Sequence, residues 1–184
     1  RIFCEYRDQR SFPLLLPLLD QPCPVERMSA VYALGRNPCP SAVQKLVSLL
    51  ETDDNAYVRR ATAWSLANYD NPIVLKPLIN ALKNDVAAVR LWSSSSLAEI
   101  GNVSSKNAEL AAEQLLISLK IDNESGVRSN CIWSLCRLFE KLNNTFQECF
   151  VDECTKIALF DKEPSVMEEA KTALDSMGMQ GFYN

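Results

Sequence analysis

Small and apolar residues recur along this chain in one fixed order, counted from an arginine. Valine or glutamate precedes the arginine, small residues follow three and six positions later, and leucine follows seven positions later. Counted from the first of these sites, the spacing is i, i+4, i+7 and i+8, which is one face of an α-helix. The pattern therefore predicts a repeated helix with one buried face. The copies contain Arg27, Arg59, Arg90 and Arg128, and a fifth keeps the spacing with Met167 in place of the arginine.

A second apolar helix follows each copy, so each repeat is predicted to be a helical hairpin. The copies start 32, 31, 38 and 39 residues apart, and a period of about 20–50 residues is typical of a repeat array. No segment alternates polar and apolar residues over the length of a strand. We therefore predict an all-α fold, an α-solenoid (alpha-alpha superhelix) of about five repeats.

The predicted organisation is a single domain, 1–184. It has full repeats at 24–51, 55–83, 85–120 and 124–160, a half repeat at 163–178 and a tail at 179–184. Residues 1–20 match the end of a truncated repeat, in which Ile2 and Phe3 would close a first helix. Because the sequence also lacks an initiator methionine, we expect it to be a fragment.

The turns between the predicted helices contain glycines and aspartates at recurring places. Gly35, Gly101 and Gly178 follow first-helix leucines, where a left-handed residue commonly closes a helix. Three aspartates lie five residues before the valine of the next copy, as helix caps or as partners of an arginine. They are Asp53, Asp122 and Asp161.

Composition excludes several classes of function. The net charge is −4, which argues against nucleic acid as the main partner, and no apolar run approaches the ~18 residues of a membrane span. The chain has no histidine and only five scattered glycines, so histidine-dependent catalysis, histidine-bound zinc and a glycine-rich phosphate loop are excluded. These absences argue against an enzyme acting alone.

Seven cysteines, an odd number, indicate a reducing compartment. Cys131 and Cys136 occupy predicted core positions, which suits small buried hydrophobic side chains. The spacing within the Cys131/Cys136 and Cys149/Cys154 pairs fits metal knuckles poorly. We therefore expect no metal site and no resident cofactor, and we expect the cytoplasm or the plastid stroma as the compartment.

Three groups of residues are candidates for binding. Four aromatic residues at related first-helix positions predict a row that serves inter-repeat packing or, alternatively, a partner or planar chromophore: Tyr32, Trp64, Trp92 and Trp133. The arginines Arg27, Arg59, Arg90 and Arg128 predict a series of inter-repeat Arg–Asp bonds, with anion or propionate binding as the alternative. A polar second-helix face is predicted to line a concave partner groove: Gln44, Lys45, Ser48, Lys76, Asn80, Lys83, Gln114 and Ser118.

The repeat sequence resembles a known family. Residues 55–66 (NAYVRRATAWSL), 85–97 and 77–82 are similar to the HEAT-like repeats of phycobilisome lyases, and the resemblance covers essentially the whole chain. Residues 29–38 look most like cyanobacterial or plastid proteins of this group. The chain departs from the pattern at Glu26, which replaces a valine, and at Met167.

The resemblance implies a protein-binding scaffold or adaptor in the maturation of tetrapyrrole pigments, as in the phycobilisome, or of iron–sulfur proteins. Its partner would be a phycobiliprotein, a second lyase subunit or an iron–sulfur scaffold protein. The alternative is a bilin lyase subunit, which would hold a bilin transiently while it is attached to or removed from an antenna-protein cysteine. Deoxyhypusine hydroxylase shares these repeats, but its metal ligands are His–Glu pairs, so its activity does not carry over. A carrier of a cysteine-bound cluster is a third, weaker alternative.

Overall fold

The computed structural model describes residues 9–179 and 181, and every regular element in them is a helix. The predicted all-α fold class is therefore confirmed. The chain divides into two compact units, 1–100 and 101–184, which we call the N-terminal and the C-terminal unit. The predicted ends of the single domain stay a prediction, and the helix expected to close at Ile2 and Phe3 lies outside the described residues.

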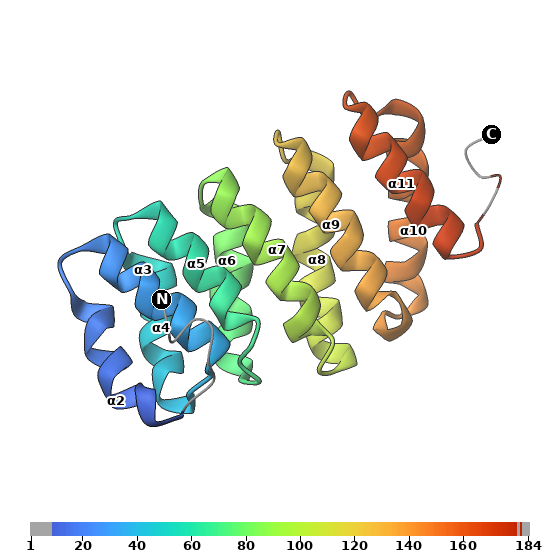
Figure 1. The fold of residues 1–184 in the computed structure, drawn as a ribbon. Helices are drawn as coiled ribbons and strands as arrows, with labels where there is room; N and C mark the ends of the chain where they lie inside the picture. Colours follow the sequence, from blue (N-terminus) through green and yellow to red (C-terminus); the bar gives the residue numbers. More distant parts are fainter. Residues whose placement is uncertain (1–8, 180, 182–184) are drawn as a thin grey trace. The chain divides into compact units, whose positions relative to one another are not determined.

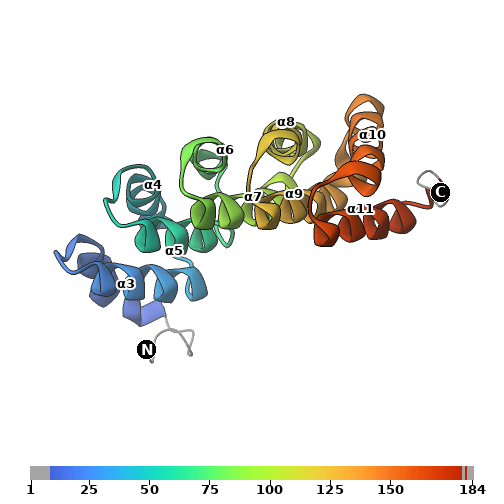
Figure 2. The same ribbon diagram turned by 90° about the horizontal axis from the view of Figure 1, so that it is seen from above.

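The N-terminal unit has two layers of helices. Helices α3, α5 and α7 form the first-helix layer, and α4 and α6 form the second-helix layer (Figures 1 and 2). Helix α5 packs against both α3 and α4, and α2 packs on α3. The bounds are α2 (Phe12–Leu15), α3 (Pro24–Arg36), α4 (Val43–Thr52), α5 (Ala56–Leu66), α6 (Leu75–Asn84) and α7 (Ala87–Gly101), with 3₁₀ turns η1 (Gln9–Ser11), η2 (Leu16–Asp20), η3 (Pro40–Ala42) and η4 (Pro72–Val74).

The C-terminal unit repeats this arrangement. Helices α9 and α11 lie in its first-helix layer, and α8 and α10 lie in its second-helix layer (Figure 2). Helix α9 packs on α8 and α11, and α10 packs on α11. The bounds are α8 (Ser105–Ile121), α9 (Ser125–Leu138), η5 (Phe139–Lys141), α10 (Asn144–Phe160) and α11 (Pro164–Ser176).

The repeated sequence pattern forms the core of both units. The leucine seven positions after each arginine, or after Met167 in the fifth copy, is fully buried, as is the small residue at the third position. Small side chains at these sites let neighbouring first helices approach closely. The leucines are Leu34, Leu66, Leu97, Leu135 and Leu174.

Asparagine and serine side chains mark where helices begin. The Asn55 carboxamide oxygen accepts a hydrogen bond from the Tyr57 N–H at 2.9 Å, at the start of α5. Asn71 caps the turn that leads into α6, with a proline at the first helical position, as its sequence predicts. Ser104 and Asn143 cap α8 and α10 in the same way. These caps fix where the loops between the helices end.

Two of the three predicted closing glycines have a different role. Only Gly178, among the three, has a positive φ, of 76°. Gly35 lies in the last turn of α3, where an added Cβ would come within 2.5 Å of Cζ3 of Trp64. Gly101 ends α7, where a Cβ would meet Leu138 at 2.9 Å. The expectation for Gly35 and Gly101 is wrong, because these sites require close helix approach rather than left-handed backbone.

A buried tyrosine joins two loops of the N-terminal unit. The Tyr69 hydroxyl donates a hydrogen bond to the Leu34 carbonyl at 3.0 Å and accepts one from the Cys39 N–H at 3.4 Å. Burial raises the pKa of this phenol to about 12. The hydroxyl thereby satisfies backbone groups at the end of α3 that cannot reach water.

Candidate functional site

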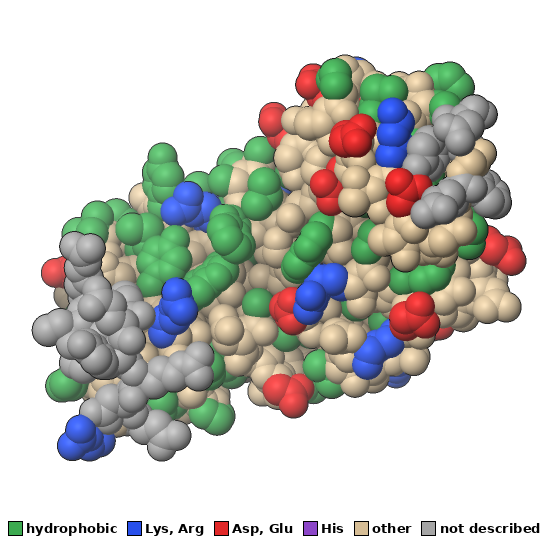
Figure 3. All heavy atoms as spheres, turned by 45° about the vertical axis from the view of Figure 1, so that its right-hand side comes forward, with side chains coloured by type: hydrophobic (Ala, Val, Ile, Leu, Met, Phe, Trp, Pro, Cys, Tyr) green, Lys and Arg blue, Asp and Glu red, His purple; other side chains and the backbone are tan. Residues whose placement is uncertain are grey.

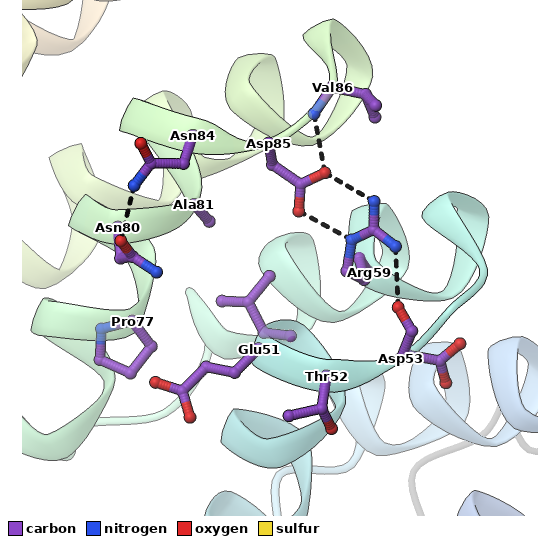
Figure 4. A pocket seen from close by; sticks show the side chains of 11 residues that line it. Glu51, Thr52, Asp53, Arg59, Pro77, Asn80, Ala81, Asn84, Asp85 and Val86 are labelled. Carbon is purple, nitrogen blue, oxygen red and sulfur yellow. Dashed lines mark hydrogen bonds and ion pairs between the residues drawn. The ribbon is translucent and has the colours of Figure 1, made fainter.

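Three of the candidate arginines hold a loop aspartate of the next repeat in an arrangement that we call the clasp. The guanidinium donates from Nε and Nη2 to the two carboxylate oxygens, for Arg59 at 2.8 and 2.7 Å. Its Nη1 donates back to a carbonyl of the preceding loop, for Arg59 the Asp53 carbonyl at 2.7 Å (Figure 4). The pairs are Arg27 with Asp53, Arg59 with Asp85 and Arg128 with Asp161.

The clasp also fixes the charge of its aspartates. Burial raises the pKa of Asp161, but hydrogen bonds from Arg128 and the Glu163 N–H outweigh burial and hold it below the ordinary value. At Asp53, burial is likewise outweighed by the hydrogen bonds from Arg27 and the Asn55 N–H. The donors of these arginines are used within the protein, which supports the packing role over anion binding.

The fourth arginine, Arg90, belongs to the N-terminal unit. Its Nη1 donates to the Asp85 carbonyl at 2.8 Å. It therefore contacts the loop before its own helix in the same manner as Arg59 and Arg128 do.

The aromatic residues of the predicted row occupy different surroundings. Tyr32 and Trp64 make a tilted ring contact with centroids 5.4 Å apart. Trp92 is exposed on α7, and Trp133 is exposed on α9 in the C-terminal unit, where the Arg137 guanidinium lies 5.1 Å from its ring. The structure thus brings together one pair, and a row across all four remains a prediction.

The Tyr32–Trp64 pair lies within a larger surface of the first-helix layer. We define the aromatic–arginine surface as Tyr32, Tyr57, Trp64, Arg36 and Arg60. The Arg36 guanidinium lies 5.8 Å from the Trp64 ring, and that of Arg60 lies 5.5 Å from the Tyr57 ring. Figure 3 shows hydrophobic side chains gathered over the N-terminal unit with cationic side chains among them.

A hollow of about 160 Å³ adjoins this surface. Its walls are mostly apolar, and Tyr57, 66% exposed, stands at its edge beside Arg60. The Arg60 Nη2 donates to the Tyr32 hydroxyl at 3.3 Å, whereas its buried Nε has no hydrogen-bond partner among the described residues. The remaining lining residues are Pro24, Val25, Met28 and Asn55.

Each unit also has a groove at the ends of two second helices. The α4–α6 groove, of about 370 Å³, is lined by Glu51, Thr52, Asn80 and Asn84 beside the clasp of Arg59 (Figure 4). The α8–α10 groove, of about 390 Å³, lies beside the clasp of Arg128. Its other principal lining residues are Lys120, Ile121, Glu153, Lys156, Phe160 and Lys162.

The residues of the predicted polar face differ in exposure, and a partner groove lined by them remains a prediction. Gln114 and Ser118 are only 8% and 4% exposed, and the Gln114 amide donates to the Ser118 hydroxyl at 3.2 Å. Their expected place on an open groove is therefore wrong, because the outward side of α8 carries apolar Ile117 and Ile121 instead. The other six residues are exposed or half-buried, with Lys45 paired to Asp20: Gln44, Lys45, Ser48, Lys76, Asn80 and Lys83.

Three cysteines of the C-terminal unit lie in surroundings that disfavour the thiolate. Burial raises the pKa of the Cys136 thiol to about 11 and raises the pKa values of Cys131 and Cys154 further. Within residues 9–179 and 181, no three His, Cys, Asp or Glu side chains gather in a way that could hold a metal ion. No helix in that part of the chain is long and apolar enough to cross a membrane.

A family model described as HEAT repeats matches residues 1–67 and 43–136. The chain belongs to the HEAT-repeat family. No curated protein matches its sequence. The match confirms the HEAT-like repeats expected from the sequence. It does not distinguish the phycobilisome-lyase subgroup from other HEAT-repeat proteins.

Solved structures with the same fold are diverse in function. A chain of the complex of CpcE and CpcF of phycocyanin lyase from Nostoc sp. PCC7120 is 22% identical, with a TM-score of 0.71, and the match covers 90% of this chain and 99% of that one. A designed armadillo repeat protein in complex with the peptide (KR)4 is 19% identical, with a TM-score of 0.63 and coverage of 92% and 89%. Human deoxyhypusine hydroxylase in complex with glycerol is 17% identical, with a TM-score of 0.56 and coverage of 98% and 76%. At these identities the similarity shows the α-solenoid fold alone.

Three residues outside the core of this HEAT-repeat chain were not among the predicted site residues. Tyr57 lies two residues before Arg59, and Arg60 lies one residue after it. Both are on the outward side of α5, which the pattern of core positions does not include. Phe160 is assigned to the apolar second helix by its sequence pattern, yet it is 80% exposed. The signal that could have found it is its place directly before the clasp aspartate Asp161, where the helix ends.

Proposed function

We propose that this HEAT-repeat chain is a protein-binding scaffold and that its N-terminal unit holds a partner on the aromatic–arginine surface. The observation that supports this most is the state of Arg60. Among the described residues its guanidinium makes one hydrogen bond, of 3.3 Å, to Tyr32, whereas each clasp arginine forms at least four. A guanidinium with unused donors beside apolar and aromatic side chains is suited to a carboxylate from another protein.

The neighbouring side chains favour a protein surface over a small ion. Tyr57 is largely exposed, and Val25, which lines the adjoining hollow, is 60% exposed. Tyrosine, tryptophan and arginine are the residue types that contribute most to protein–protein binding energy. The partner is therefore expected to present an acidic residue next to a large apolar one.

A photo-crosslinking experiment tests this proposal. A photoreactive phenylalanine analogue replaces Tyr57 in one version of the chain and the exposed Ile73 in the control version, each expressed in the organism that encodes the chain. We expect one protein to be captured from position 57 and not from position 73. The purified partner should then bind Tyr57→Ala/Arg60→Ala at least tenfold more weakly than the parent.

Two results would contradict the proposal. One is equal capture from positions 57 and 73. The other is a purified partner that binds the double variant as tightly as the parent while both chains melt at the same temperature. The second measurement is informative because Tyr57 is exposed and its truncation should leave the fold intact.

The finer part of the proposal concerns the pathway. The family resemblance of the repeats, together with the similarity to a chain of the CpcE–CpcF complex, favours a role in tetrapyrrole-pigment maturation over one in iron–sulfur protein maturation. The partner would then be a phycobiliprotein or a second lyase subunit, and in the iron–sulfur case a scaffold protein for cluster assembly. Identification of the crosslinked partner distinguishes these classes.

A lyase subunit is the second candidate, and that structural similarity is also the observation that favours it. In this case the chain would help to attach or remove a linear tetrapyrrole at a cysteine of an antenna protein. The test is incubation with a bilin and an apo-phycobiliprotein, with and without candidate second subunits, followed by absorbance spectroscopy. The absence of bilin binding in every combination would remove this candidate.

A further inference from the structure

The α8–α10 groove exposes large apolar side chains at its rim. Ile121, the last residue of α8, is 72% exposed, and Phe160, the last residue of α10, is 80% exposed. Ile117, one turn before Ile121, is 43% exposed and extends the apolar surface along α8. Apolar side chains gathered around a hollow and edged by charges are typical of an interaction site.

The α4–α6 groove provides an internal comparison, because it is built on the same clasp. Thr52 and Asn84 directly precede Asp53 and Asp85 in that groove, and Ile121 and Phe160 directly precede Asp122 and Asp161 in the other. Both of these polar residues are exposed. The clasp geometry therefore does not require apolar side chains at these positions. The needs of the fold do not account for the apolar side chains of Ile121 and Phe160.

The two grooves also differ in the charges of their lining side chains. One cationic and three anionic side chains line the α4–α6 groove, whereas four cationic and three anionic side chains line the α8–α10 groove. In the latter, Lys120 and Lys156 both lie near Glu153, at 3.8 and 3.5 Å, so a single carboxylate faces two ammonium groups. A basic rim on a chain of net charge −4 favours an acidic ligand.

We infer that the α8–α10 groove binds a segment of a protein partner in which a large apolar side chain is flanked by acidic residues. The apolar side chain packs between Ile121 and Phe160, and the carboxylates pair with Lys120, Lys156 and Lys162. A free anion would leave the apolar rim in water, and three lysines beside Glu153 are too few for a nucleic-acid backbone. This site lies within the C-terminal unit and does not depend on the aromatic–arginine surface.

A peptide selection tests the inference. Random 12-residue peptides displayed on phage are first depleted of those that bind the variant Ile121→Thr/Phe160→Asn and are then selected on the whole parent chain. The variant gives the α8–α10 groove the matching side chains of the α4–α6 groove. We expect the enriched peptides to carry aspartate or glutamate beside leucine, phenylalanine or tryptophan. Fluorescence anisotropy should show that these peptides bind the parent at least tenfold more tightly than they bind this variant or the variant Lys156→Gln/Lys162→Gln. Their binding to the parent should weaken as the salt concentration is raised.

The control variant makes equally apolar-to-polar changes elsewhere. Ile73→Asn/Val103→Thr alters two exposed residues outside the groove and should bind the selected peptides like the parent. The inference is wrong if no peptide distinguishes the parent from Ile121→Thr/Phe160→Asn, or if the peptides that do so are basic or lack large apolar residues. It is also wrong if only phosphatidylserine vesicles or DNA oligonucleotides distinguish the two chains.

Discussion

The two units share the clasp and differ in the side chains that surround it. In the N-terminal unit, the clasp of Arg59 and Asp85 keeps 18% and 12% of its side-chain surface exposed. In the C-terminal unit, the clasp of Arg128 and Asp161 keeps 5% and 7% exposed. The Arg59 clasp is therefore more exposed than the Arg128 clasp, while the other clasp of the N-terminal unit, Arg27 with Asp53, keeps 12% and 2% exposed.

The free surfaces differ as well. The N-terminal unit has the aromatic–arginine surface on its first-helix layer. The C-terminal unit has only the Trp133–Arg137 pair of this kind among its described residues, and it exposes Ile121 and Phe160 on its second-helix layer. The repeat sets the backbone and the clasp, and positions one residue away from the clasp vary without affecting it. The comparison teaches that binding chemistry in this chain should be sought beside the repeated residues rather than at them.

The largest expected effect is that of Arg128→Ala. It leaves the Asp161 carboxylate buried without its cation, and removal of one partner of a buried ion pair costs about 3–5 kcal/mol. Urea denaturation should show this loss in the free energy of unfolding. Arg59→Ala should cost less, because its partner Asp85 is better solvated.

A double variant separates the ion pair from packing. Arg128→Ala/Asp161→Ala removes both charges, so part of the stability should return relative to Arg128→Ala alone. Equal losses for Arg128→Ala and Arg59→Ala would mean that burial does not distinguish the two clasps.

A smaller effect is expected for Tyr69→Phe in the N-terminal unit. The change removes a hydroxyl that donates to the Leu34 carbonyl and accepts from the Cys39 N–H. Buried backbone groups that lose their partner cost about 1–3 kcal/mol. The control is Tyr57→Phe, whose exposed ring should leave the unfolding midpoint unchanged. An equal midpoint for both variants would show that water replaces the Tyr69 hydroxyl.

Acid should weaken both units through their clasps. The pKa values of Asp53 and Asp161 are lowered in the folded chain, so the unfolded chain binds more protons as pH falls below about 4–5. The stability that these carboxylates supply is present above their unfolded pKa and is lost as pH falls through the lower folded pKa. Urea denaturation between pH 7 and 2 should show this decline. Arg128→Gln/Asp161→Asn should flatten it, and an unchanged slope would contradict the assignment.

The core and most of the clasp could be predicted from the sequence because they depend on spacing that the repeats share, but Asp85, four residues before Val89, is not among the predicted aspartates. Leucine seven residues after the arginine and aspartate before the next copy are fixed by helix and loop geometry, as Leu66 and Asp53 illustrate. The outward face of α8 could not be predicted. Helix α8 has 17 residues where α4 has 10, so positions that are exposed in α4 do not map onto Gln114 and Ser118.

The role of Gly35 was also beyond the sequence pattern. The pattern placed it at a helix end, where left-handed backbone is common, but its purpose lies in a contact with Trp64 on the neighbouring helix. Such a contact depends on the distance between two helices, which a single helix's sequence does not contain. The same holds for Arg60, whose proposed role in binding rests on what its guanidinium lacks in the folded chain.

The smallest expected effect on stability is that of converting one groove into the other. Glu51→Lys/Thr52→Ile/Asn80→Lys/Asn84→Phe gives the α4–α6 groove the side chains found at the matching places before Asp122 and Asp161 in the α8–α10 groove. All four residues are exposed, so the unfolding free energy should change by less than about 1 kcal/mol.

The acidic peptides selected on the α8–α10 groove should then bind a second site, doubling the stoichiometry in isothermal titration calorimetry. Thr52→Ile/Asn84→Phe alone should not achieve this, because Glu51 and the clasp aspartates keep that groove anionic. If instead the fourfold variant is destabilised by more than about 2 kcal/mol, the side chains beside the clasp contribute to folding. The difference between the two units would then reflect stability rather than binding.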